Sequence, residues 1–460
     1  MARRKETLFE KIWVLRGVIA VVSVPLILIA TIVMLMPRNH TNAFDGHDHH
    51  HSVPAHGVQK AAPVDPADRF SIVFDAGSTG SRVHIFKFKD AHGQPELVSD
   101  TFEQLKPGLS SFAADPAKGA QSLMPLLQKA VDTVPQSLQR STMVQVRATA
   151  GLRLLPGDQA ESLLAAVRKL LKSYPFLHDD SSVTIMDGAD EGAFAWITLN
   201  YLLGKMDGHV DNSVAAIDLG GGSVQLAHAV EHATAEHAPA GYIHPLKGGG
   251  STYSVYVHSY LGYGIMAARA AVLSAHPGAG HPCLPAGFSG EYRYGGKTYP
   301  AEGDEHGADV GACAAAIEGA LQKGKDCGVQ HECSFNGAWG GGGGGGARSF
   351  YVSSYFFDRA VESGVIPDPE AISFTTTPKA FGDAASKACT GAAADVAATF
   401  PKVEGDHAPY FCMDVLYCAT LMTEGFGIKA GQEFTLVKRI EYNGDQVEAA
   451  WPLGAAINSL

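Results

Sequence analysis

The chain is short of positive charge. It carries 35 lysine and arginine residues against 47 aspartate and glutamate residues, a formal net charge of −12. This sign repels phosphate backbones and therefore argues against non-specific binding of nucleic acid. Charged residues make up only 18% of the sequence and hydrophobic residues 46%, which excludes an intrinsically disordered chain. A length of 460 residues exceeds one ordinary core and predicts two lobes or domains.

Cysteine is missing from the N-terminal half, and all seven cysteines lie in the C-terminal half. They are Cys283, Cys313, Cys327, Cys333, Cys389, Cys412 and Cys418. Their number and placement predict disulfides formed in an oxidising compartment, with one cysteine left over. The spacing alone leaves the connectivity open.

Long hydrophobic runs are also scarce, and one stands out. Residues 18–36 form an uncharged run of 19 residues, which is long enough to cross a bilayer. Five basic residues precede it and only Arg38 follows closely, so the positive-inside rule predicts a single-pass type II membrane protein. We expect residues 1–17 to be a cytosolic tail, 18–36 a transmembrane anchor and 37–68 a flexible stem, with the remainder lumenal or extracellular. A cleaved signal peptide is the alternative; the run is long for one, and its end offers a poor cleavage site.

Two segments share one pattern. Residues 75–82 (DAGSTGSR) follow the apolar run 71–74 (SIVF), and residues 218–225 (DLGGGSVQ) follow the run 214–217 (VAAI). Each is a short β-prone run, an aspartate, a turn of glycine and hydroxyl residues, and a return to β-prone residues. Such a hairpin lets backbone N–H groups crowd around a phosphate, because glycine has no Cβ and tolerates positive φ. Two copies predict a duplicated nucleotide-binding core with phosphates clamped between its halves.

The remaining pattern alternates strands with helices. We expect a hairpin of residues 72–74 and 83–88, strands at 144–149 and 183–186, and helices at 119–134, 161–173 and 192–203. This alternation is typical of α/β lobes.

Two further segments carry chemistry. Residues 147–153 (RATAGLR) end a strand in Thr149 and a glycine, which offers a hydroxyl and a close backbone. Residues 187–192 (DGADEG) place Glu191 at the start of a helix. A glutamate there can complement the helix dipole, or it can be a general base that takes a proton from water.

Taken together, these segments resemble the five signature regions of the apyrase (nucleoside triphosphate diphosphohydrolase) family. In order along the chain, the matching segments are 72–82, 148–153, 190–201, 217–225 and 449–454 (AAWPLG). They span the whole folded part, and the stretches 281–283 and 410–414 look most like plant-type members.

The resemblance implies a two-lobed, actin-like ATPase fold, a duplicated ribonuclease H-like α/β architecture with the active site in the interlobe cleft. Lobe I would comprise residues 69–187 and 440–460, and lobe II residues 188–439. Carried over position by position, it assigns phosphate binding to the two loops. The assigned residues are Ser78, Thr79, Gly80, Ser81, Arg82, Gly220, Gly221, Gly222 and Ser223.

By the same resemblance, Asp75 and Asp218 hold the waters around Ca²⁺ or Mg²⁺. An acidic protein that acts on a polyanionic nucleotide needs such a cation as a bridge. Glu191 would be the base for the attacking water, with Thr149, Ser223 and Gln225 orienting that water.

The family also suggests that Phe357 and Phe411 stack on the base, although core packing is an equally open alternative for both. It implies the pairs Cys283–Cys313, Cys327–Cys333 and Cys389–Cys412, and leaves Cys418 as a buried free thiol.

The expected activity is metal-dependent hydrolysis of nucleoside tri- and diphosphates to the monophosphate. A Golgi-type diphosphatase that prefers UDP and GDP is one alternative. An exopolyphosphatase is disfavoured by the anchor, the cysteines and the segment 449–454. A non-catalytic nucleotide sensor is the alternative from another class. Golgi, endoplasmic reticulum and cell surface are all compatible with the expected topology, and the anchor permits oligomers.

Overall fold

The structure is a computed structural model that describes residues 65, 67–91, 94–276, 278, 280–329, 333–342, 349–390 and 392–460. These residues belong to one compact unit, Pro63–Leu460. The predicted tail, the predicted anchor and all but the end of the predicted stem lie outside the described residues. Within the described ranges, no helix combines the length and apolar character that a membrane span requires.

The first sheet has five strands in the order β3-β2-β1-β4-β5. Its central strand β1 pairs antiparallel with β2 and parallel with β4. The strands are β1 (Arg69–Ala76), β2 (Ser81–Ala91), β3 (Gln94–Leu105), β4 (Met143–Ala148) and β5 (Val183–Ile185). The side chains of β1 alternate between two cores: Ile72 and Phe74 join one cluster, and Val73 joins another on the opposite face. Both faces are therefore covered, which explains the almost continuous apolar run in the sequence.

The second sheet repeats this arrangement. Its order is β13-β14-β12-β6-β7-β9-β8, and its strand β6 pairs antiparallel with β7 and parallel with β12. The strands are β6 (Ala215–Leu219), β7 (Ser223–Ala229), β8 (Ile243–Gly248), β9 (Ser251–Leu261), β12 (Phe350–Ser354), β13 (Ser373–Thr376) and β14 (Phe434–Val437). The series β9-β7-β6-β12-β14 thus matches β3-β2-β1-β4-β5 in order and direction. This confirms the predicted duplication of a two-lobed α/β fold.

Helices cover both sheets. Those up to the second sheet are α2 (Pro116–Ser122), α3 (Met124–Thr133), α4 (Gln136–Gln139), α5 (Ala150–Arg153), α6 (Gln159–Leu171) and α7 (Gly188–Leu202). The later ones are α8 (His232–His237), α9 (Ile265–Ala275), α10 (Val310–Leu321), α11 (Tyr355–Ser363), α12 (Pro378–Ala388), α13 (Ala393–Thr399), α14 (Phe411–Thr420) and α15 (Trp451–Ser459). Two small hairpins complete the fold: β10 (Ser289–Tyr294) with β11 (Lys297–Glu302), and β15 (Arg439–Tyr442) with β16 (Asp445–Glu448).

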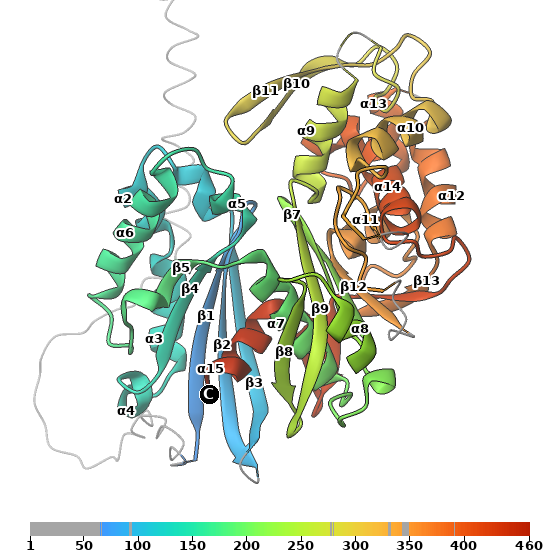
Figure 1. The fold of residues 1–460 in the computed structure, drawn as a ribbon. Helices are drawn as coiled ribbons and strands as arrows, with labels where there is room; N and C mark the ends of the chain where they lie inside the picture. The colour runs from blue at the N-terminus through green and yellow to red at the C-terminus, as the bar shows by residue number, and fades with distance from the viewer. Residues whose placement is uncertain are drawn as a thin grey trace, which may run out of the picture. The chain divides into compact units, whose positions relative to one another are not determined.

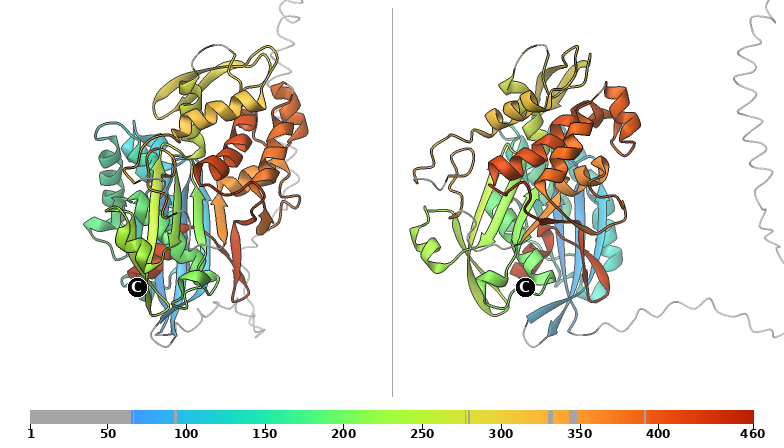
Figure 2. Two further views of the ribbon diagram at one scale, coloured as in Figure 1. Left: turned by 45° about the vertical axis from the view of Figure 1, so that its right-hand side comes forward. Right: turned by 90° about the vertical axis from the view of Figure 1, so that its right-hand side faces the viewer.

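Helices α7 and α15 join the two sheets. They pack on each other, α15 also on β1, and α7 also on β7 and β9 (Figure 1). The turned views again show α15 (red) between the blue strands of the first sheet and the green strands of the second (Figure 2). Trp196 of α7 and Trp451 of α15 belong to this shared core. Because both helices serve both sheets, the predicted lobe boundaries stay predictions.

Two predicted helices have different bounds. The helix expected at 119–134 is two helices, α2 and α3, because Pro125 in the first turn of α3 has no N–H for a continuous helix. The helix expected at 192–203 begins earlier, at Gly188, where Asp187 caps it by accepting a hydrogen bond from the Ala189 backbone N–H at 2.8 Å. Glu191 therefore lies within the first turn of α7.

The three disulfides agree with the pairing that the resemblance implies. Cys283–Cys313, Cys327–Cys333 and Cys389–Cys412 are bonded, and Cys418 is free and buried.

Candidate functional site

The two glycine-rich turns face each other. A Cβ built at Gly221 would lie 2.6 Å from Ser78 Oγ, so the second turn touches the first. The first turn is also held from behind: a Cβ at Gly108 would lie 2.4 Å from the Gly77 carbonyl oxygen, and one at Gly151 would lie 2.8 Å from Ser78 Cα. The sequence suggested that these turns use positive φ, but none of their glycines does so. A Cβ added at Gly77, Gly80, Gly221 or Gly222 would instead lie within 3.0 Å of a neighbouring backbone or side-chain atom, so these positions have no room for a side chain.

A cavity of about 760 Å³ opens where the turns meet. Its wall includes ten of the residues predicted to form the site. They are Asp75, Ser78, Thr79, Arg82, Thr149, Glu191, Asp218, Gly220, Gly221 and Phe357. Residues from both halves of the duplicated fold therefore share one cavity, as the twin-loop pattern predicts.

Glu191 is an acid of the cavity with a strongly raised pKa. Arg153 Nη2 donates a hydrogen bond to its Oε2, and Gln225 Nε2 donates to the same oxygen at 3.2 Å. Burial raises the pKa of Glu191 to about 8, although Arg153 acts in the lowering direction. The negative charges of Asp218 and Asp75 contribute to this rise. Glu191 therefore exchanges its proton close to pH 8, a range that suits a general base far better than the ordinary pKa of a glutamate.

Behind Glu191 lies a set of hydrogen-bonding side chains. Gln225 Nε2 also lies 2.7 Å from Ser223 Oγ and 3.0 Å from Ser259 Oγ, so its two hydrogens are shared among these hydroxyls and Glu191. Gln225 and Ser223 are each 1% exposed and are absent from the cavity wall among the residues described. Gln225 thus holds Glu191 from its buried side, and Ser223 contacts Gln225.

The two leading aspartates are held differently. Arg82 Nη1 donates to Asp75 Oδ2 at 2.9 Å, whereas Asp75 Oδ1 is buried and has no hydrogen-bond partner. Asp218 Oδ1 accepts a hydrogen bond from Ser354 Oγ at 2.5 Å, and Ser353 Oγ lies 3.4 Å away. Burial raises the pKa of both aspartates.

This donor set fits a hard divalent cation. The carboxylate oxygens are the ligand type that Ca²⁺ and Mg²⁺ prefer, and the orphaned oxygen of Asp75 is unmatched negative charge. Among the described residues, no group of three His, Cys, Asp or Glu side chains is arranged to hold a metal ion alone.

The prediction for Phe411 does not fit the structure. Phe411 is fully buried and packs on Phe400, with ring centroids 5.1 Å apart, so it cannot stack on a base in the cavity. Phe357 lies on the cavity wall but is only 3% exposed. Three further residues predicted to bind phosphate are absent from the described cavity wall: Gly80, Ser81 and Gly222.

Several residues of the site escaped prediction. Arg153 lay within the second signature segment, but nothing local marked it as the partner of Glu191. Ser354, the last residue of β12, has φ of 62° and ψ of −127°, an unfavourable conformation for a non-glycine residue, and its hydroxyl donates to Asp218. Tyr355, the first residue of α11, lines the same cavity wall as Thr79 of the first turn.

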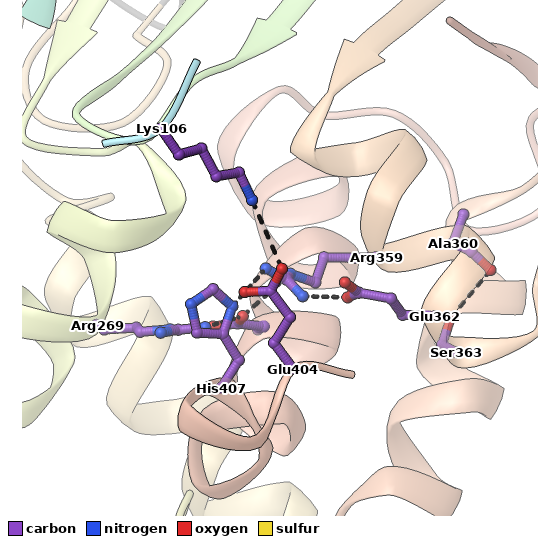
Figure 3. Close-up of polar contacts among 9 residues, drawn as sticks. Lys106, Arg269, Arg359, Ala360, Glu362, Ser363, Glu404 and His407 are labelled. Atoms are coloured by element: carbon purple, nitrogen blue, oxygen red, sulfur yellow. Dashed lines mark hydrogen bonds and ion pairs between the residues drawn. The ribbon is translucent and has the colours of Figure 1, made fainter. Parts of the chain in front are cut away.

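The outer wall of the cavity is charged. Arg269 Nε donates to Asp414 Oδ1 at 2.7 Å, and Arg359 Nε lies 3.1 Å from Asp414 Oδ2. Arg359 Nη1 also donates to Glu362, and its Nη2 lies 3.5 Å from His407 Nδ1 (Figure 3). Of this group, Arg359, Glu362 and His407 reach the cavity wall.

The two lobes also approach each other at this wall. Lys106, directly after β3, points toward Glu404 of the second half, with Nζ 3.5 Å from Oε1 (Figure 3). Both side chains are mostly exposed, so the pair contributes little to stability.

The sequence and the fold were compared with those of known proteins. Residues 62–460 match the GDA1/CD39 (nucleoside phosphatase) family. "Probable apyrase 2" of Oryza sativa subsp. japonica is 41% identical over 465 residues, covering 99% of this chain and 97% of that protein. "Apyrase 1" of Arabidopsis thaliana is 42% identical over 400 residues, 85% of each chain. The crystal structure of nucleoside triphosphate hydrolases from Neospora caninum superposes with a TM-score of 0.60 at 15% identity, covering 85% of this chain and 92% of that one, which supports the fold alone.

Proposed function

The chain belongs to the GDA1/CD39 (nucleoside phosphatase) family as an apyrase-type hydrolase, and we propose that it hydrolyses nucleoside tri- and diphosphates to the monophosphate. One observation carries this proposal: the twin glycine-rich turns meet beside a buried glutamate whose pKa lies near neutrality. Phosphate-binding backbone and a proton acceptor thus share one cavity.

The turns provide the phosphate clamp. Ser78, Thr79, Gly220 and Gly221 line the cavity from opposite halves of the fold, where their backbone N–H groups are suited to phosphate oxygens. Arg82 adds a positive charge to the same wall. A terminal phosphate held between the turns would occupy the same place in a tri- and a diphosphate, so phosphates would leave one at a time.

Glu191 is the proposed general base. Water attacks the terminal phosphorus as its proton passes to Glu191; the new P–O bond forms, the bridging P–O bond breaks, and the shortened nucleotide leaves. Arg153 and Gln225 fix one carboxylate oxygen of Glu191, which reduces its freedom to turn away. The Thr149 hydroxyl on the cavity wall is suited to orient the water.

Asp75 and Asp218 would hold Ca²⁺ or Mg²⁺ through its water shell. When bound, the cation neutralises charge on the phosphate oxygens. The protein contributes two buried carboxylates that lack full compensation, because Asp75 has one orphaned oxygen and Asp218 has only hydroxyl partners.

We also propose a lumenal or extracellular site of action for a type II membrane protein. Three disulfides support an oxidising compartment, and the basic residues before residues 18–36 support the orientation.

Phosphate release by the purified full-length chain tests the proposal, with ATP, ADP, UDP, GDP and AMP as substrates and with Ca²⁺, Mg²⁺ or EDTA present. We expect metal-dependent release from ATP and ADP and none from AMP. Release confined to UDP and GDP would support the diphosphatase alternative, and release from none would refute hydrolysis.

A further inference from the structure

One histidine of the first sheet is held between two carboxylates. His84, on β2, is 1% exposed; its Nδ1 lies 3.0 Å from Asp100 Oδ2 on β3, and its Nε2 lies 3.1 Å from Glu448 Oε2 on β16. Its ring stacks on Phe86 with centroids 5.3 Å apart. Burial acts to lower the pKa of His84, but the two carboxylates raise it to about 10, so the imidazole is charged at neutral pH.

This histidine belongs to the cavity wall. His84, Glu448 and Arg82 all line the cavity, and Glu448 is the last residue of β16, directly before the segment 449–454. The negative charge of Glu448 acts on Arg82 and, with Asp75, raises the pKa of the Arg82 guanidinium despite burial. Charges therefore alternate in sign from Asp100 through His84, Glu448 and Arg82 to Asp75.

The alternation matters because two carboxylates, Asp75 and Glu448, interact electrostatically with Arg82. It forms a hydrogen bond with Asp75 at 2.9 Å, while Glu448 is paired with His84 instead. Without the imidazolium, Glu448 would be a buried carboxylate in need of a cation. The other positive charges that act on it are Arg82 and, more weakly, Arg439, and of these two only Arg82 lies on the described cavity wall. An Arg82 drawn to Glu448 would leave Asp75 unpaired.

We propose that His84 is a positioning residue, which ties Glu448 to the first sheet so that Arg82 stays paired with Asp75. The inference rests on the proposed function, in which Asp75 and Arg82 serve the phosphate and its cation. Strand β2 would then supply two residues to the site, Arg82 and His84.

The test is a suppression experiment in the full-length chain. His84→Gln is expected to lower kcat about tenfold, in the middle of the range for directly coupled residues, with a smaller change in KM. Because the harm arises from an unpaired Glu448, the double variant His84→Gln/Glu448→Gln is expected to recover kcat to within about twofold of Glu448→Gln alone. A merely structural histidine would give no such recovery. A double variant as slow as His84→Gln, or slower, overturns the proposal.

Lys87→Met is the matched control. Lys87 lies on the same strand and forms an ion pair with Asp68 at 2.8 Å, but neither residue lines the cavity among those described. Its loss removes a comparable pair from β2, so kcat is expected to stay unchanged. An equal loss of kcat in Lys87→Met would mean that any weakening of β2 slows the enzyme, and would overturn a specific role for His84.

A second readout needs neither turnover nor a folded His84 variant. Nitrogen-15 NMR of the histidine-labelled wild type at pH 8.5 is expected to show one charged imidazole, whose resonance shifts in Glu448→Gln, because ordinary histidines are neutral at that pH. Finding every imidazole neutral overturns the proposal. If the wild type releases no phosphate, the proposed function fails, and the NMR result alone then decides whether the His84–Glu448 pair exists as inferred.

Discussion

Glu191→Gln separates catalysis from stability more sharply than any other substitution in this chain. The amide keeps the size of the carboxyl and can still accept a hydrogen bond from Arg153, but it cannot take a proton from water. General base catalysis contributes roughly 10²–10⁴-fold, so we expect kcat to fall by at least about 100-fold. Nucleotide binding should survive, because Glu191 holds no part of the phosphate clamp.

The same substitution should stabilise the fold at neutral pH. The pKa of Glu191 rises from the ordinary 4.5 to about 8, so the folded protein binds this proton more tightly than the unfolded chain does. Wild-type stability is therefore lost as the pH rises from 4.5 toward 8. At pH 7 and without metal or nucleotide, a neutral replacement is expected to gain about 3 kcal/mol, and at pH 5 only about 1 kcal/mol.

Phosphate release and urea unfolding at both pH values check the two halves of this prediction. Asp190→Asn is the control: Asp190 lies one residue earlier in the same helical turn, and it is not part of the active-site cavity wall. It should keep turnover within about twofold, as expected for a residue outside the reaction. A Glu191→Gln variant that still turns over refutes the base assignment. If the variant gains the same unfolding free energy over wild type at pH 5 as at pH 7, the charge argument is refuted.

Three further outcomes are expected. Gly108→Ala should lower turnover more than about tenfold, since its Cβ would meet backbone of the first turn at 2.4 Å, whereas Gly382→Ala, with nothing within 4 Å, should not. Mg²⁺ or Ca²⁺ should raise the Tm of the wild type, measured by scanning calorimetry, and should raise the Tm of Asp218→Asn much less. Equal shifts in the two proteins would exclude this aspartate from the cation site. Replacing both Cys389 and Cys412 by alanine should cost about 3 kcal/mol in urea unfolding, because their bond closes a separation of 23 residues; an unchanged midpoint would contradict this.

The local parts of the site were predictable from sequence, because each is formed by residues of one short segment. An apolar run, an aspartate and a glycine-rich turn define β1–β2 and β6–β7, and their duplication pointed to a cavity between two halves. The first turn of α7 was less clear, since the residues before Gly192 lack an apolar pattern and the cap at Asp187 sets the start of the helix.

Contacts between distant segments were not predictable in this way. Ser354 reaches Asp218 across 136 residues, and Arg153 reaches Glu191 across 38. Only the packing of strands and helices decides such pairs. Phe411 shows the converse: it sits in an apolar helix, where sequence cannot tell a ring in the core from a ring in the cavity. The disulfide pairs came from family resemblance, since spacing alone permits many connectivities.

The directions of the pKa shifts show which carboxylates of the cavity wall are stabilised by nearby positive charges and which are not fully stabilised. Asp75, Asp218 and Glu191 are all buried with raised pKa values, so the fold holds them at a cost. Burial acts to raise the pKa of Glu448 on the same wall, but His84, Arg82 and Arg439 together lower it. Asp358 and Glu362 of the same wall also have raised pKa values, so position beside the two turns is what sets Asp75, Asp218 and Glu191 apart. Three incompletely compensated carboxylates at the meeting point of two phosphate-binding turns are a site that becomes favourable only when a cation and a transferable proton arrive.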